Sequence, residues 1–301
     1  MSLIIERVSK ENEPSLVRYC EKHGSEHDGS YLPGRDFKIT EDHPSYLLFK
    51  DDQLVGAVSL MRTKRFLSVN KGRFSIFHST LNTEKAYAKL MNAIQPHLED
   101  LESVYLFIPE EKKETASILT SLEFQIERYS FVLELKIDDP LQVEFPEGVV
   151  VQHLGPSDQV GISQFAACLN EEFNELAGHT TSTPEDIQTW FDDPGQIEDG
   201  ICLLKKDQEP IGTIGLMKDL ENLEAGEIGA FGILEKYRGQ ELGRNLLRYG
   251  VNFLIGQGLN PVILSVNGEN HGAFKLYQAE GFNLTESVVC YALDCTQILD
   301  D

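Results

Sequence analysis

The chain lacks any segment suited to a membrane or to secretion. No apolar run in its 301 residues approaches the ~18 residues that span a bilayer. Its first residues show no basic stretch followed by an apolar core and a small-residue cleavage site, so no signal peptide is expected. Hydrophobic residues make up 41% of the chain and charged residues 25%, as in soluble globular proteins. We therefore expect a cytoplasmic protein without a membrane partner, and the length suits two domains.

Cysteine is scarce, and its pattern excludes two kinds of framework. The five cysteines are Cys20, Cys168, Cys202, Cys290 and Cys295. Their number is odd and no two of them form a C-x-x-C pair, which predicts reduced thiols and neither a disulfide frame nor a zinc site. We expect no metal site and no cysteine nucleophile.

Basic residues are also few. The net charge of −23 would repel phosphate backbones, which argues against a nucleic-acid partner. Residues 141–301 hold only 8 Lys and Arg against 26 Asp and Glu. Five of these eight basic residues lie between positions 236 and 275, namely Lys236, Arg238, Arg244, Arg248 and Lys275. The acidic second half therefore gathers its positive charge in one place.

That place is a glycine-containing loop between a strand and a helix. An apolar strand is predicted at residues 230–234, a loop at 237–243, and a helix that ends near Gly256; a second apolar strand follows at 262–266. Free N–H groups and the helix dipole both favour an anion at a helix N-terminus. The segment therefore predicts a site for a phosphate-bearing cofactor.

The chain contains a divergent internal repeat. Residues 51–61 resemble residues 206–217, and each segment predicts a hairpin with a charged turn and a shared glycine, Gly56 or Gly212, in its second strand. Strands and helices follow in the same order in both halves, which implies a mixed sheet in each. Residues 138–148 are proline-rich and acidic, and we expect a linker at 141–148 between a domain at 1–140 and a domain at 149–301.

The second half resembles a GNAT-superfamily N-acetyltransferase over residues 149–293. The family's pyrophosphate loop, [Q/R]-x-x-G-x-[G/A], is matched by Arg238-Gly239-Gln240-Glu241-Leu242-Gly243. The family's later pattern is matched by Val266, Asn270, Ala273, Leu276-Tyr277 and Gly281-Phe282. The resemblance implies acetyl-CoA or another acyl-CoA as co-substrate. It also implies an α/β (α+β) fold of two tandem GNAT-like domains, each a mixed, mostly antiparallel sheet with splayed central strands and flanking helices.

The resemblance further implies a set of cofactor-binding residues. The set is Phe231, Ile233, Arg238, Gly239, Gln240, Glu241, Leu242, Gly243, Arg244, Asn270, Ala273 and Lys275. Backbone N–H groups of the loop would hold the CoA pyrophosphate, with arginine and lysine side chains as supporting charge. The N–H groups of Phe231 and Ile233 would face the acyl and pantetheine carbonyls and stabilise the oxyanion. Asn270 would cap the second helix.

One loop residue departs from the family pattern. The family usually has glycine where this chain has Glu241. Glycine lets the backbone approach a phosphate and carries no charge, whereas a glutamate either repels the phosphates or turns to solvent at the start of the helix. The other features of the site favour the solvent-facing interpretation.

The resemblance assigns two catalytic residues. Tyr277 aligns with the tyrosine that protonates the departing CoA thiolate, and a hydroxyl of pKa ~10 suits that role. The alternative is that Tyr277 only packs on the cofactor. Glu227 aligns with the strand glutamate that removes the proton of the amine. The alternative is that Glu227 is only a surface residue of the strand. The base would then be a water molecule held by backbone carbonyls, or His179.

The acceptor amine is expected near residues 170–191, by the resemblance. Glu171, Glu172 and Glu175 form an acidic helix face there, which either attracts an ammonium group or is simply solvated. The first half lacks the loop, because residues 77–83 contain neither glycine nor arginine. We interpret that half as a degenerate copy that binds no CoA and shapes the acceptor pocket or the surface of a homodimer.

The sequence therefore predicts an N-acyltransferase. It would move an acetyl group from acetyl-CoA to a primary amine of a small molecule or peptide by direct attack, without a covalent enzyme intermediate. The competing hypothesis is a non-catalytic acyl-CoA-binding regulatory protein, which Glu241 favours and which Tyr277 and Glu227 oppose. Acyl groups larger than acetyl are a third possibility.

Overall fold

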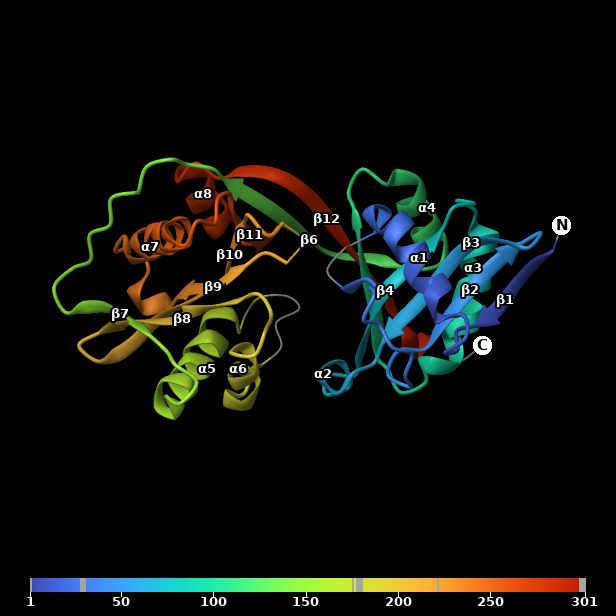
Figure 1. The fold of residues 1–301 in the computed structure, drawn as a ribbon, viewed down its shortest axis with the longest axis horizontal. Coiled ribbons are helices and arrows are strands. Elements are labelled where there is room, and N and C mark those ends of the chain that lie inside the picture. The colour runs from blue at the N-terminus through green and yellow to red at the C-terminus, as the bar shows by residue number, and fades with distance from the viewer. Residues whose placement is uncertain (1, 28–30, 175, 177–180, 221, 298–301) are drawn as a thin grey trace. The chain divides into compact units, whose positions relative to one another are not determined.

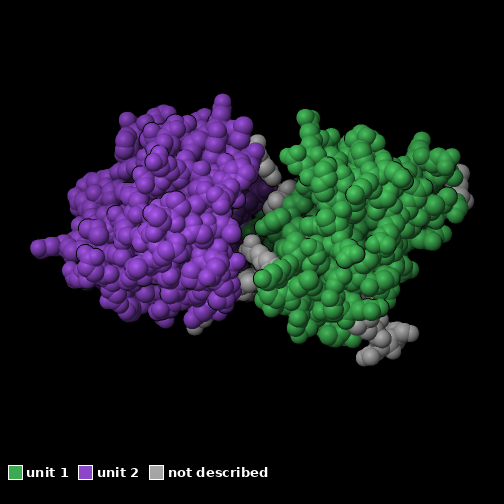
Figure 2. Space-filling view, turned by 60° about the horizontal axis from the view of Figure 1, so that its bottom comes forward, with its two compact units in different colours: residues 1–130, 287–301 green, residues 131–286 purple. Residues whose placement is uncertain are grey.

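The computed structural model describes residues 2–27, 31–174, 176, 181–220 and 222–297. The chain forms two compact units, coloured separately in Figure 2: unit 1 is residues 1–130 with 287–301, and unit 2 is residues 131–286. Within the described residues, no helix combines the length and the apolar character needed to cross a membrane.

Unit 1 is a sheet with the strand order β1-β2-β3-β4-β5-β12, and its helices pack on it (Figure 1). Its elements in chain order are β1 (Leu3–Arg7), α1 (Glu13–His23), β2 (Ser45–Lys50), β3 (Gln53–Met61), α2 (Lys64–Leu67), β4 (Lys71–Ser79), α3 (Glu84–Ile94), β5 (Ser103–Pro109) and α4 (Lys113–Ser121). β6 (Gln125–Leu135) then continues into unit 2.

Unit 2 has a similar order of elements, and its strands lie in the order β6-β11-β10-β9-β8-β7. Its elements are β7 (Val149–His153), α5 (Gln159–Phe173), α6 (Pro184–Trp190), β8 (Gln196–Lys206), β9 (Glu209–Lys218), β10 (Gly226–Ile233), α7 (Leu242–Gly256), β11 (Val262–Asn267) and α8 (His271–Ala279). β12 (Asn283–Asp294) then continues into unit 1. The neighbours β7-β8, β8-β9 and β9-β10 are antiparallel and β10-β11 is parallel, so the predicted mixed, mostly antiparallel sheet is confirmed.

Alternating side chains bind helices to both faces of the unit 2 sheet. Along β8, Cys202 and Leu204 join a core cluster with α7 and α8, while Ile201 and Leu203 join another with α5 and α6. Successive strand residues point to opposite faces, so a continuous apolar run is what a sheet covered on both sides requires. Figure 1 shows α7 and α8 on one side of this sheet and α5 and α6 on the other.

Helix α7 follows directly from its apolar spacing. The residues that it buries are Leu242, Leu246, Leu247, Gly250, Val251 and Leu254, an i, i+4, i+8 stripe on one face. A Cβ at Gly250 would lie 2.6 Å from Cδ1 of Ile214 on β9, so glycine is what allows this helix to lie so close to the sheet.

The closing strands of the two halves differ from the predicted domain ranges. The domain predicted at 149–301 was to be closed by a strand near 288–293, but residues 287–301 belong to unit 1. There Val288 to Asp294 of β12 pair with β5, and Tyr291 is buried in the unit 1 core. In turn, Leu133 and Leu135 of β6 are buried in the unit 2 core. Alternating apolar residues specify a strand but not its partner, which is why the sequence did not reveal this exchange.

The predicted linker at 141–148 lies against α7 and not free between the units. The backbone of Leu141 exchanges two 2.8 Å hydrogen bonds with the side chain of Asn252, and the N–H of Glu144 donates to Oδ1 of Asn245 at 2.9 Å. This segment belongs to unit 2.

Candidate active site

The candidate site opens where β10 leaves β11. Their parallel pairing covers Gly226 to Ile228, whereas β10 continues to Ile233. The pairing of β10 with β9 shifts register between Gly229 and Gly232, and Ala230 has a positive φ of 45° at this bulge. A bulge of this kind turns the strand and exposes its edge.

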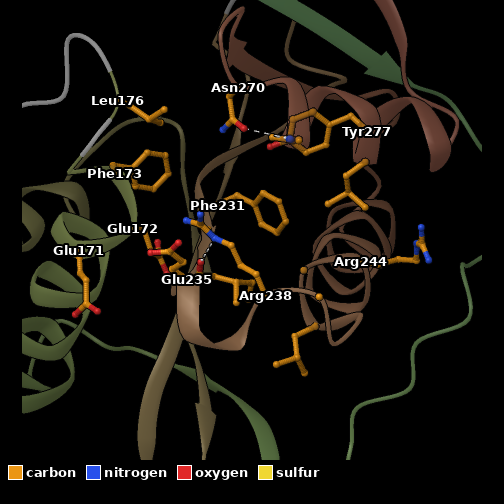
Figure 3. A pocket seen from close by; sticks show the side chains of 18 of the residues that line it. Glu171, Glu172, Phe173, Leu176, Phe231, Glu235, Arg238, Arg244, Asn270 and Tyr277 are labelled. Carbon is orange, nitrogen blue, oxygen red and sulfur yellow. Dashed lines mark hydrogen bonds between the residues drawn. The ribbon is translucent and has the colours of Figure 1, made fainter.

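A cavity of about 620 Å³ lies beside this part of β10. Among its lining residues are eleven of the residues predicted from the sequence: Phe231, Ile233, Arg238, Gly239, Glu241, Leu242, Gly243, Arg244, Asn270, Ala273 and Tyr277. They come from β10, the loop, α7 and α8, which converge as Figure 3 shows. The sequence had predicted this convergence from a single continuous segment of the chain.

Three predicted residues lie outside this lining. Gln240 and Lys275 are exposed. Glu227 lies at the paired end of β10, opposite Met217 of β9 and Ile263 of β11. None of the three is among the residues that line the cavity.

The loop before α7 has the backbone of an anion site. Gly239 has φ of 74°, and a Cβ there would meet nothing within 4 Å. Glu241 is the N-cap residue of α7, with a left-handed φ of 60°, and its side chain makes no capping hydrogen bond. The first N–H groups of a helix have no partner inside it, so an uncapped N-terminus offers them to a phosphate. These residues therefore fit the pyrophosphate of CoA.

The charges around the loop are partly paired. Nε of Arg238 donates to the carbonyl of Ile233 at 2.9 Å and ties the loop to the end of β10. Arg244 pairs with Glu241 and, at 2.8 Å, with Glu280. The Glu241 side chain is 63% exposed, so its carboxylate lies at the surface and against an arginine. This agrees with the solvent-facing interpretation of that residue.

Tyr277 is held in the cavity wall by aromatic neighbours. It is 5% exposed, and its ring lies 6.0 Å from the ring of Phe231 and 6.0 Å from that of Phe282, centroid to centroid. Burial raises the pKa of the Tyr277 hydroxyl, which therefore keeps its proton until a strong base arrives. Asn270 caps α8 as predicted, because its Oδ1 accepts from the N–H of Ala273 at 3.1 Å (Figure 3).

Glu172 is the residue whose position sequence reasoning missed. The acidic face was interpreted as an ammonium-attracting or a solvated surface, yet Glu172 on α5 is 8% exposed and lines the cavity. Desolvation raises the pKa of its carboxyl to about 8. A signal was present, because Glu172 follows Phe165, Cys168 and Leu169 at helical spacing on the buried face.

Other residues predicted near the acceptor have different outcomes. Glu171, also on α5, is exposed and lines the same cavity. Glu175 and His179 lie outside the residues that the structure describes. Glu172 and Glu171 are therefore the acidic residues of this face that the structure brings to the cavity.

Residues 164–282 match the acetyltransferase (GNAT) family. The chain is similar to this family over these residues. The matched stretch covers α5 through α8, and so contains the loop, β10 and Tyr277. GNAT acetyltransferases use acetyl-CoA as co-substrate.

Curated relatives of this chain are named mycothiol acetyltransferase. The protein of Kocuria rhizophila is 28% identical over 51% of this chain and 52% of its own length. The protein of Rhodococcus erythropolis is 27% identical over 57% of this chain and 60% of its own length. The chain thus matches little more than half of the length of these relatives.

Solved structures share the fold over nearly the full chain. A GCN5-related N-acetyltransferase from Sphaerobacter thermophilus has a TM-score of 0.72 at 16% identity, with coverage of 97% of this chain and 96% of that one. A tandem GNAT protein from the clavulanic acid biosynthesis pathway has a TM-score of 0.70 at 13% identity, with coverage of 98% and 99%. At these identities the likeness shows the tandem GNAT fold.

Proposed function

We propose that unit 2 is an acetyl-CoA-dependent N-acetyltransferase. The observation that carries this proposal is the convergence in one cavity of an uncapped helix N-terminus, a strand edge freed from its neighbour, and Tyr277. A helix N-terminus that binds phosphate would by itself suit many ligands. The same N-terminus beside a free strand edge and a buried hydroxyl suits a long phosphate-bearing thioester.

Each of these parts has a separate role in acyl transfer. The N–H groups at the start of α7 hold the pyrophosphate of CoA. The edge of β10 at Phe231 and Ile233 receives the pantetheine arm and donates N–H groups to the thioester carbonyl, which favours the developing oxyanion. Tyr277 gives its proton to the departing thiolate, whose basicity is similar to that of a phenol.

The acceptor is a primary amine of a small molecule or peptide. The cavity continues from β10 towards α5, where the exposed Glu171 supplies negative charge near the freed strand edge. An ammonium group is attracted by such a carboxylate, and it becomes a nucleophile once it loses a proton. The amine then attacks the thioester directly.

Two measurements test the function in sequence. Calorimetry with acetyl-CoA comes first and should show binding that Gly239→Asp, in the loop, abolishes. Release of free thiol from acetyl-CoA is then followed with a panel of alkylamines, aminosugars, amino acids and peptides. Thiol release with at least one amine supports the enzyme. Binding without release for any amine supports the non-catalytic alternative.

A further inference from the structure

Glu172 is a buried carboxyl group in the cavity that the proposed reaction leaves without a role. Its Oε2 lies 2.5 Å from Oγ1 of Thr213 on β9, and its Oε1 accepts from the thiol of Cys168 at 3.4 Å. Burying a carboxylate is costly unless it is paired, and neither of these partners carries a positive charge. A cost of this kind indicates a function.

The orientation of the Thr213 hydroxyl is coupled to the protonation of this carboxyl. The same Oγ1 lies 2.7 Å from the carbonyl oxygen of Ala230, which can only accept a hydrogen bond. A hydroxyl has one hydrogen, so it cannot donate to Ala230 and to Glu172 at once. When it donates to Ala230, Glu172 must be the donor in the second hydrogen bond and therefore protonated. When Glu172 is ionised, the hydroxyl turns to it.

Gly232 places this carboxyl beside the part of β10 that we assign to the thioester. A Cβ at Gly232 would lie 2.5 Å from Oε2 of Glu172, so the carboxyl occupies the space that a side chain on β10 would take. Its neighbours in the strand, Phe231 and Ile233, are the residues that we assign to the thioester. Figure 3 shows Glu172 reaching towards this strand from its helix.

We propose that Glu172, in place of Glu227, is the general base that removes the proton of the acceptor ammonium in unit 2. This inference rests on the proposed acetyltransferase function. Glu227 lies at the paired end of β10 and does not belong to the cavity lining, whereas Glu172 reaches the freed part of the strand.

The protons balance as follows. An N–H bond of the ammonium breaks, and its proton moves to the Glu172 carboxylate while the hydroxyl of Thr213 turns back to Ala230. The amine lone pair forms the C–N bond at the thioester carbon, and the C–S bond breaks with its electrons on sulfur. The second nitrogen proton reaches the thiolate by way of Tyr277. Glu172 then releases its proton to solvent, which gives one amide, one thiol and one proton.

The pKa of Glu172, about 8, suits this exchange with an ammonium group better than an ordinary carboxyl would. Desolvation raises it, while Thr213, Cys168 and Arg238 lower it in part. Three further carboxyl groups line the same cavity, namely Glu171, Glu235 and Glu241. The active carboxylate form thus increases as pH rises through about 8, so kcat/KM should fall on the acid side of that pH.

The test uses the full chain and the best amine from the panel. Glu172→Gln should lower kcat/KM by roughly 100-fold or more and remove the acid limb, with acetyl-CoA affinity unchanged. Thr213→Val should raise the pH of that limb, because the carboxylate loses a donor, and Thr213→Ser should restore it. Glu227→Gln should cost far less, and the exposed Glu198→Gln serves as the neutral control. Amines of different pKa separate a limb due to the enzyme from one due to the substrate.

The outcomes separate the two proposals. Two results would overturn the role of Glu172 and leave the acetyltransferase proposal intact. One is full turnover by Glu172→Gln. The other is an acid limb of the kcat/KM profile whose pH changes with the pKa of the amine and does not change in Thr213→Val. Binding of acetyl-CoA without thiol release from any amine overturns both proposals. Infrared difference spectra between about pH 6 and pH 9 add a check without an acceptor. A protonated carboxyl band that titrates in this range should be present in the parent protein and absent from Glu172→Gln.

Discussion

The two units carry different residues at one equivalent position of the sheet. The position is packed into the core in unit 1 and borders the candidate site in unit 2. In unit 2, Thr213 of β9 pairs with Gly232 of β10. In unit 1, Ala57 of β3 pairs with His78 of β4, one residue after the repeat's shared glycine, as Thr213 is. His78 therefore stands where unit 2 has Gly232. A glycine leaves space beside the strand, and a histidine fills it.

The helix that faces this position differs to match. In unit 1, Tyr19 of α1 bonds to Nδ1 of His78 at 2.8 Å, and both side chains are buried. In unit 2, Glu172 of α5 takes the space beside Gly232. The same pair of elements thus forms a packed polar contact in one unit and the wall of a cavity in the other.

The helix N-termini that follow these strands differ as well. Thr83 caps α3 in unit 1, since its hydroxyl accepts from the N–H of Ala86 at 3.4 Å. Glu241 gives α7 no such cap. A capped N-terminus has fewer N–H groups to offer an anion. Among the described residues, unit 1 thus has a capped helix and a histidine where unit 2 has an uncapped helix and Gly232.

Moving the unit 1 residue into unit 2 should have the largest effect. Gly232→His would place an imidazole where Oε2 of Glu172 already lies 2.5 Å from a single Cβ. It should displace the carboxyl and block the strand edge, and lower kcat/KM by about 1,000-fold, more than the ~100-fold that a 1 Å misplacement costs. The thiol-release assay measures this.

Gly155→His is the matched control, because a Cβ at Gly155 meets nothing within 4 Å. It should leave activity and folding unchanged. If Gly232→His also kept its activity, the proposed contrast between the two strands would be wrong.

Removing the hydroxyl of Tyr277 should have the next largest effect. Tyr277→Phe keeps the ring contacts with Phe231 and Phe282, so packing and acetyl-CoA affinity should be preserved. Loss of a general acid costs about 100-fold at the low end, and thiolate is a fair leaving group, so we expect kcat to fall by about that much. The steady-state rate of thiol release measures kcat, and calorimetry measures the affinity for acetyl-CoA.

Tyr249→Phe controls for the loss of a tyrosine hydroxyl in the same unit. Its hydroxyl contacts Nε2 of His153 at 2.7 Å, away from the cavity lining. A tenfold or smaller difference between Tyr277→Phe and this control would favour a packing role for Tyr277.

The sequence predicted most of the helices and strands and the cofactor side of the site, because both depend on residues that are close together in the chain. The stripe from Leu242 to Leu254 specifies α7, and the loop from Arg238 to Gly243 sits beside it in the chain. Partners far apart in the chain were not accessible in this way. The pairing of β12 with β5 depends on which sheet edges are available, which alternation does not encode.

The acceptor side of the site was less predictable for the same reason. Helical spacing puts Glu172 on the buried face of α5, but its role depends on Thr213 and Gly232, 41 and 60 positions later. Glu227 was assigned by alignment with a strand glutamate, and only the register of β10 places it at the paired end of the strand. The positions of Glu172 and Glu227 relative to the cavity therefore depend on contacts in the folded structure.

The histidine that fills unit 1 should make the protein sensitive to acid. Burial lowers the pKa of His78 to about 4, although Glu26 opposes the shift; His23 and Lys112 add to it. Between about pH 6.5 and pH 4 the unfolded chain binds a proton that the folded chain does not, so stability falls as pH falls. The expected loss is of the order of 1–3 kcal/mol. Urea unfolding followed by circular dichroism at several pH values measures it.

His78→Asn should reduce this pH dependence, because asparagine does not titrate but still offers an acceptor to Tyr19. The exposed His271→Asn is the control and should retain the full dependence. Equal slopes for the two variants would show that His78 is not the group responsible. His78, His23 and Lys112 lower the pKa of Glu26 against its burial, so a further loss below about pH 4.5 is expected in the parent protein and in His271→Asn.

Restoring the family glycine in the loop should have the smallest effect. Glu241→Gly removes a negative charge at the phosphate end of the cavity and suits the left-handed φ of 60°. It frees Arg244 from one of its two carboxylate partners. Calorimetry should show acetyl-CoA affinity unchanged or raised by up to about tenfold, roughly 1.4 kcal/mol.

Asp207→Gly, at another acidic residue with positive φ, controls for backbone relief and should leave the affinity unchanged. A large loss of affinity in Glu241→Gly alone would show that this carboxylate helps to hold the cofactor. The contrast between a capped unit 1 helix and an open unit 2 helix would then need a different explanation.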